Sequence, residues 1–290
     1  MLTLILISST QAQYSGLTEG KAHTVKLYYS NGQQARASSI VQRVDDAMVY
    51  YSRMLNFKPD VTLLVLTQKD WSTHTDFPVY GMPHFKDEKV LVVAAENNAL
   101  WKSFIPPLEQ LPQDLRSPIA TTYKGADGAL SMEPFFDLLA LHELGHAFHL
   151  QAGLNMQRKW MGELFVNVLL HTYIAEKEPA SLPALTLFPR MVIAGGTKEY
   201  QFTSLQEVHD KYEEIGKGHP KNYGWYQSRW HAAAATIYNK DGKGAGRKLW
   251  DALKAQKENV NDAALLSLLQ AAGVPSVADM IQNWDKDTIR

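Results

Sequence analysis

The sequence has no cysteine, which excludes disulfide bonds and thiol chemistry. Any bound metal ion must therefore be held by histidine, aspartate or glutamate side chains. No apolar run approaches the ~20 residues that a membrane-spanning helix requires, so no membrane span is expected. Charge of one sign is not in excess either, because 29 Lys and Arg residues offset 30 Asp and Glu residues. Without a basic stripe, a nucleic-acid partner is not expected.

The composition that remains is that of a globular protein. The 290 residues are 45% hydrophobic and 20% charged, which suffices for one large or two small cores. The N-terminal stretch MLTLILISSTQAQ is a short apolar run followed by small and polar residues, with Thr10 and Ala12 where signal peptidase prefers small side chains. Residues 1–12 are therefore a candidate signal peptide, although no Lys or Arg precedes Lys21, and the protein is expected to be secreted or periplasmic. The alternative is a buried first strand.

The pattern of the first third predicts a small mixed β-sheet with one helix. Residues 23–30, 61–67 and 89–95 are short runs rich in apolar and β-forming side chains, which are typical of strands. Residues 35–55 carry apolar side chains at helical spacing. The intervening segment 68–88, rich in aromatics, Pro and His, is predicted to be a loop. We assign residues 20–130 to a mixed α/β subdomain.

After about residue 120 the pattern turns helical. Apolar spacing with Pro and Gly punctuation predicts no further strand and a series of helices, over 134–153, 157–178, 204–215, 224–240, 246–256, 261–273 and 276–284. Residues 131–290 are assigned to active-site helices and a helical C-terminal subdomain. The expected fold class is α+β, with a small mixed sheet and helix, a histidine-bearing helix at the junction, and an all-helical C-terminal part.

The histidine-bearing helix contains HELGH at residues 142–146. Residues four apart lie on one helix face, so His142 and His146 can direct ring nitrogens at a single metal ion. Glu143 is rotated by about 100° and can reach a water beside the ion. This is the HExxH arrangement, with two histidine ligands and Glu143 as general base, and the small Gly145 leaves room for close packing. The alternative is an ordinary helix whose histidines are hydrogen-bonded.

A catalytic zinc site needs a third protein ligand. The HExxHxxGxxH extension is absent, because position 152 is alanine. Glu163 lies 17 residues after His146 at the start of the next predicted helix, and antiparallel packing would bring it back to the metal. Glu176 and Glu178 are rivals in a more charged setting. We therefore predict a Zn²⁺ site that Glu163 completes.

HELGH followed by GELFVN at residues 162–167 resembles the gluzincin metallopeptidases, in both their thermolysin-like and aminopeptidase-N-like branches. The resemblance implies a zincin-like fold, zinc-dependent hydrolysis of a peptide or protein substrate, and a third zinc ligand on the helix after HExxH. That ligand corresponds to Glu163, although Gly162 stands where these families have Asn. It also implies that a polar residue one turn later, here Asn167, orients the first zinc histidine.

The same resemblance implies a donor that stabilises the oxyanion formed during hydrolysis. Aminopeptidase-N-like enzymes use a tyrosine at the start of a later helix, which corresponds to Tyr226. Tyr223 is the second candidate, and His231 is the third because thermolysin-like enzymes use a histidine. A peptide substrate would add to an edge strand, for which residues 89–95 are the candidate. The aminopeptidase signature GxMEN is missing, so exopeptidase activity is not predicted.

Two other hypotheses remain open at this point. The chain could be a non-catalytic module that retains zinc and binds a peptide or glycan. It could also hydrolyse a non-peptide amide, since the metal and base would be identical. His149, His171 and Asp137 are interpreted as structural or surface residues.

Overall fold

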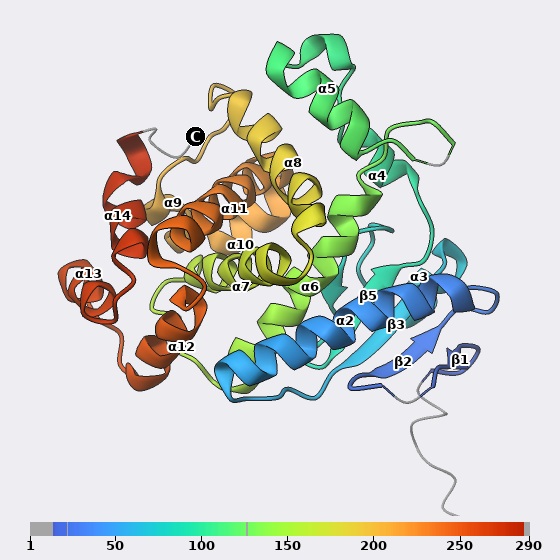
Figure 1. The fold of residues 1–290 in the computed structure, drawn as a ribbon, viewed down its shortest axis with the longest axis horizontal. Coiled ribbons are helices and arrows are strands. Elements are labelled where there is room, and N and C mark those ends of the chain that lie inside the picture. Colours follow the sequence, from blue (N-terminus) through green and yellow to red (C-terminus); the bar gives the residue numbers. More distant parts are fainter. Residues whose placement is uncertain (1–13, 22, 126, 287–290) are drawn as a thin grey trace, which may run out of the picture.

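The computed structural model describes residues 14–286, apart from residues 22 and 126. The candidate signal peptide, residues 1–12, lies outside the described residues. The described chain is α+β, with a five-stranded mixed sheet formed by the N-terminal part and a helical C-terminal part (Figure 1). This confirms the expected fold class at the level of its architecture.

The sheet has the strand order β1-β2-β3-β5-β4. Its strands are β1 (Thr18–Glu19), β2 (Lys26–Tyr29), β3 (Thr62–Leu66), β4 (His84–Phe85) and β5 (Val90–Ala94). The central strands β2, β3 and β5 are parallel, whereas β1 and β4 pair antiparallel at the two edges. Every residue of β3 and β5 is buried, which explains why both read as continuous apolar runs rather than as alternating ones.

The prediction that residues 89–95 form an edge strand is wrong. β5 lies between β3 and β4, and the edge belongs to β4. The reason is a tight hairpin in which the Asp87 carboxylate accepts hydrogen bonds from the backbone N–H groups of Lys89 and Val90. The chain therefore folds back and covers the outer side of β5. The predicted loop also contains helix α3 (Gln68–His74).

Helix α6 (Glu133–Gln151) lies between the sheet and the helical part (Figure 1). It contacts α2 (Gln34–Leu55), β4 and β5 on one side and α7 (Met161–Lys177) and α8 (Leu182–Ala194) on the other. Because α6 and α7 are covered on several sides, they are apolar around most of their circumference. The apolar side chains of the sheet and of the helices form one continuous core.

Two contacts fix the position of α6. The Arg36 guanidinium of α2 donates two hydrogen bonds to the Asp137 carboxylate of α6. Of the two interpretations of Asp137, structural or surface residue, the structure supports the structural one. On the opposite side, Gly145 lies against Val166 of α7 so closely that an added Cβ would be 2.9 Å from the Val166 Cβ. The close packing expected at Gly145 is confirmed.

The remaining helices are α4 (Ala99–Ser103), α5 (Gln113–Thr122), α9 (Leu205–Asp210), α10 (Tyr212–Gly218), α11 (Pro220–Asp241), α12 (Ala245–Ala255), α13 (Asp262–Ala271) and α14 (Pro275–Asn283), with short 3-10 turns at Leu108–Gln110, Pro179–Ser181 and Trp284–Lys286. Of these helices, α11 and α12 contact α7. The predicted helix 204–215 is divided into α9 and α10. Helices α5 and α8 were not predicted, and each contains an internal proline. Within the described residues, no helix combines the length and the hydrophobicity needed to cross a bilayer.

Candidate metal centre

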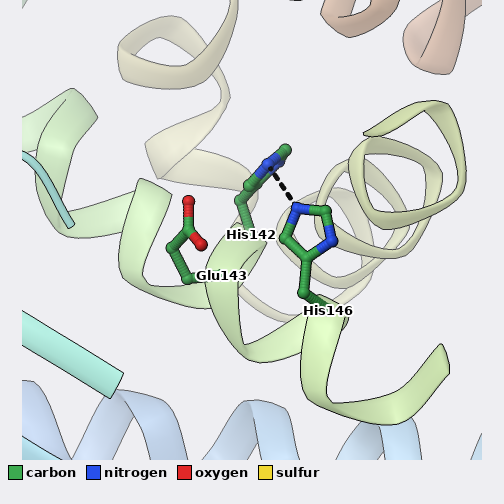
Figure 2. Close-up of side chains that lie close together, drawn as sticks. All are labelled: His142, Glu143 and His146. Atoms are coloured by element: carbon green, nitrogen blue, oxygen red, sulfur yellow. Dashed lines mark hydrogen bonds between the residues drawn. The ribbon is translucent and has the colours of Figure 1, made fainter. Parts of the chain in front are cut away.

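Helix α6 carries the three polar side chains of the HExxH motif in its middle, and Figure 2 shows them together. The Nε2 atoms of His142 and His146 are 3.3 Å apart, as expected for residues one helical turn apart. The Glu143 carboxylate lies beside them, with a carboxylate oxygen within 4.8 Å of a ring nitrogen of each histidine. Two imidazole nitrogens thus converge on one point, next to a carboxylate.

Helix α7 brings a second carboxylate to the same point. Oε2 of Glu163 is 3.2 Å from Nε2 of His142 and 3.4 Å from Nε2 of His146. Glu163 is buried, with 7% of its surface exposed, so it is not a solvent-facing helix residue. The structure therefore brings together the three residues that the sequence predicted as metal ligands.

These three donor atoms fit a tetrahedral zinc ion. Zinc binds imidazole nitrogen and carboxylate oxygen at about 2.0–2.1 Å, so two ligands of a tetrahedral site are separated by about 3.3–3.4 Å. The triangle between His142, His146 and Glu163 has sides of 3.2, 3.3 and 3.4 Å. Glu143 is the alternative third ligand, because one of its oxygens lies within 4.8 Å of a nitrogen of each histidine. We favour Glu163, whose Oε2 lies within 3.4 Å of both nitrogens. Two nitrogen donors also argue against Ca²⁺ or Mg²⁺, which prefer oxygen.

Each histidine is oriented by a hydrogen bond on its other ring nitrogen. Nδ1–H of His142 donates to Oδ1 of Asn167 over 2.9 Å, which agrees with the role predicted for Asn167. Nδ1 of His146 is 2.9 Å from Nε2 of His149. Burial and the neighbouring His146 lower the pKa of His149 to about 3, so His149 is neutral and its Nε2 can accept a hydrogen bond from Nδ1–H of His146. Such partners fix the ring orientation and the tautomer that leaves Nε2 free for a metal.

Two polar side chains from α10 and α11 donate hydrogen bonds to the Glu163 carboxylate, and a third, Tyr223, contacts both of them. Tyr212 donates its hydroxyl proton to Oε1 over 2.5 Å, and Nε2 of Gln227 donates to Oε2 over 2.8 Å. The Tyr223 hydroxyl lies 3.1 Å from that of Tyr212 and accepts from Nε2 of Gln227 over 2.9 Å. Oε1 of Gln227 in turn accepts from Asn167 over 3.4 Å. The buried carboxylate therefore sits in a connected hydrogen-bond network.

The charges of the centre respond to burial and to one another. Burial disfavours ionisation of Glu163, but the adjacent rings of His146 and His142 hold its pKa well below the usual value. Burial likewise opposes protonation of His146, yet the Glu163 carboxylate outweighs it and raises the pKa of His146 to about 9. Burial raises the pKa of Glu143, against the opposing effect of His146 and His142. The more basic Glu143 carboxylate that results suits a proton acceptor.

The structure does not bring Tyr226 to the centre, and the role expected for it needs correction. Its hydroxyl donates to the carbonyl of Ser204 over 2.8 Å, and its ring stacks on Trp230 and Trp284. The physical reason is that α11 is covered on several sides, by α7, α8 and α14 among others. Tyr226 lies on the side where its ring stacks on Trp284, the residue that follows α14. Tyr223 instead lies within the hydrogen-bond network of Glu163.

The other candidates are placed as follows. The ring of His231 lies against that of His142, with ring centroids 6.0 Å apart. Glu176 accepts a hydrogen bond from Tyr238, and Glu178 pairs with Arg43 of α2, so both rivals of Glu163 are engaged elsewhere.

Three residues of the centre were not assigned from the sequence, namely His149, Tyr212 and Gln227. A signal for Gln227 was present, because Tyr223, Gln227 and His231 are spaced by four and lie along one side of α11. No local pattern marks Tyr212, which comes from a separate short helix.

Two cavities lie elsewhere, with volumes of about 350 and 950 Å³. Both are bordered by α2 and contain none of the four motif and ligand side chains of α6 and α7. The donor geometry, rather than the size of a cavity, therefore marks the candidate site. Comparison of the sequence with protein-family models and with curated proteins finds no match.

Proposed function

We propose that the protein is a zinc-dependent hydrolase of peptide bonds, of the gluzincin type. The observation that carries the proposal is the triangle of donor atoms from His142, His146 and Glu163, whose sides match a tetrahedral zinc site. A second carboxylate, that of Glu143, lies beside the triangle. Three protein ligands and one open position are what distinguish a catalytic zinc site from a structural one.

Glu143 is the general base of the proposed reaction. When bound, zinc supplies Lewis-acid chemistry, since it polarises a substrate carbonyl and acidifies water. Glu143 takes the proton from the attacking water and delivers it to the leaving amine. The side chain is half-buried, so it is shielded from bulk solvent and yet accessible to a substrate.

Tyr223 replaces Tyr226 as the proposed donor to the oxyanion. It is half-buried and belongs to the network around Glu163. Burial, reinforced by the charge of Glu163, raises the pKa of Tyr223 well above its usual value, so the hydroxyl keeps its proton. A neutral hydroxyl can donate a hydrogen bond to a developing negative charge.

Glu143→Gln tests the proposal. The variant should bind one equivalent of zinc as the wild type does and lose hydrolysis of a peptide library by at least a hundredfold, in line with the contribution of general acid–base catalysis. Glu133→Gln, at the start of the same helix and outside the donor triangle, is the matched control and should keep wild-type activity.

Three outcomes separate the alternatives. Wild-type rates in Glu143→Gln would refute the assignment of the base. A zinc-loaded wild type that cleaves no peptide but binds peptides or glycans would support a non-catalytic module. Cleavage of a non-peptide amide alone would keep the chemistry and change the substrate class.

A further inference from the structure

The two oxygens of the Glu163 carboxylate have different surroundings. Oε2 faces the metal position, at 3.2 Å and 3.4 Å from the Nε2 atoms of His142 and His146. Oε1 accepts the hydroxyl proton of Tyr212 over 2.5 Å. This distance is typical of a strong hydrogen bond from a hydroxyl to an ionised carboxylate.

The chemistry of the two groups shows which of them donates the hydrogen bond between Tyr212 and Glu163. An ionised carboxylate can only accept, so Tyr212 must donate its single proton to Oε1. The Tyr212 oxygen can then accept from the Tyr223 hydroxyl, 3.1 Å away, as long as no substrate oxyanion takes up that proton. Gln227 donates to Oε2 from its amide nitrogen, 2.8 Å away. Each oxygen of Glu163 therefore has its own donor, and the Tyr212 donor acts on Oε1.

The position of Tyr212 depends on the break between α9 and α10. Lys211 joins the two helices with φ −111° and ψ 27°, which is not a helical conformation, and Tyr212 is the first residue of α10. The preceding helix α9 is held by a capping box between Ser204 and Glu207. A single continuous helix over 204–215 would give Tyr212 a different direction. The interruption thus sets where the hydroxyl lies.

We propose that Tyr212 is a positioning residue. Its hydrogen bond keeps Oε1 away from the metal position, so that Glu163 binds a metal ion through Oε2 alone. The inference rests on the proposed function, because it needs a metal ion between His142, His146 and Glu163. The two oxygens of a carboxylate share one carbon atom, so a small rotation would turn both toward the same ion. A two-oxygen mode would occupy the position that a catalytic site keeps open for water or substrate.

Tyr212→Phe tests the inference because it removes the hydroxyl and keeps the ring. The full-length chain is loaded with zinc, and X-ray absorption at the zinc edge measures how Glu163 binds, since the carboxylate carbon lies nearer the metal in the two-oxygen mode. The visible absorption of the Co²⁺-loaded protein reports a change in coordination independently. We expect one-oxygen binding in the wild type and two-oxygen binding in Tyr212→Phe.

Tyr223→Phe is the matched control. It removes the neighbouring hydroxyl but leaves the bond between Tyr212 and Glu163, so its zinc coordination should equal that of the wild type. Circular dichroism of the metal-free variants verifies the fold, and Tyr212→Leu provides a second removal of the hydroxyl.

The outcomes are distinguishable. A wild type that binds zinc, together with unchanged coordination in Tyr212→Phe, would overturn the inference and leave the proposed function intact. The same change in Tyr223→Phe would also overturn it, because the effect would then belong to the network and not to Tyr212. A folded wild type that fails to bind zinc stoichiometrically would remove the proposed function itself.

Discussion

A single methyl group at the crossing of α6 and α7 should disturb the candidate metal centre without touching any proposed ligand. In Gly145→Ala the new Cβ would lie 2.9 Å from Cβ and 3.0 Å from Cγ1 of Val166. Carbon atoms pack at about 3.5–4.0 Å, so α7 would have to retreat by roughly 0.6 Å. The nearest obstructing atom is the Val166 Cβ, which is attached directly to the backbone and cannot rotate away.

The displacement acts directly on the donor triangle, because two of its sides join α6 to α7. Those sides, 3.2 and 3.4 Å long, run from Glu163 to His142 and His146. Functional sites require their groups to be held within ~0.5 Å, which the expected shift exceeds. We expect zinc affinity to fall at least about tenfold, the lower end of the effect of disturbing groups that support a metal site. Overpacking should cost about 1–3 kcal/mol, offset by ~1 kcal/mol of helix propensity.

Chelator competition measures the zinc affinity, and urea unfolding of the metal-free protein measures the stability. Gly224→Ala in α11 is the matched control, because nothing lies within 4 Å of the added Cβ. It should bind zinc as the wild type does and gain up to ~1 kcal/mol of stability. Wild-type affinity and stability in Gly145→Ala would refute the claim that this contact sets the spacing of the ligands.

Two further predictions follow from α7. Glu163→Gln should weaken zinc binding at least about a hundredfold in chelator competition, whereas Glu176→Gln on the same helix should leave it unchanged; equal losses would contradict the choice of ligand. Burial lowers the pKa of His171 from 6.5 to about 4, so the unfolded chain binds a proton there that the folded protein does not. The free energy of unfolding of the metal-free protein should therefore fall by up to ~3 kcal/mol between pH 6.5 and 4, and His171→Phe should reduce this slope in urea titrations at several pH values. An unchanged slope would show that His171 does not contribute.

The periodicity of apolar residues along the sequence sufficed to predict a large part of the fold and the central residues of the candidate site. The buried strands β3 and β5 and the helices α2, α6 and α7 follow from runs of apolar side chains whose spacing is a property of the chain itself. His142, Glu143 and His146 are related by one helical turn, so a confident helix already places them together. Glu163 could be named because one short connection and antiparallel packing leave little freedom between α6 and α7.

The elements that were not predicted have weaker signals in the local sequence. Strands β1 and β4 have two residues each, which is too few to show alternation. The internal prolines of α5 and α8 argue against helices when the sequence is considered alone. Consequently β5 was placed at an edge that β4 occupies.

Tertiary structure alone decided which residues of α10 and α11 lie at the candidate metal centre. Helix α11 has aromatic side chains on the side next to α7 and on the side next to α14, so periodicity cannot tell which side faces the metal ligands. That choice placed Tyr223 and Gln227 at Glu163 and left Tyr226 in the aromatic cluster with Trp284. The hydroxyl of Tyr212 reaches the centre through a break between two short helices. The sequence by itself determined the candidate ligands, because they are neighbours along one helix and its successor. Their supporting groups come from distant segments that only the packing of the helices brings together.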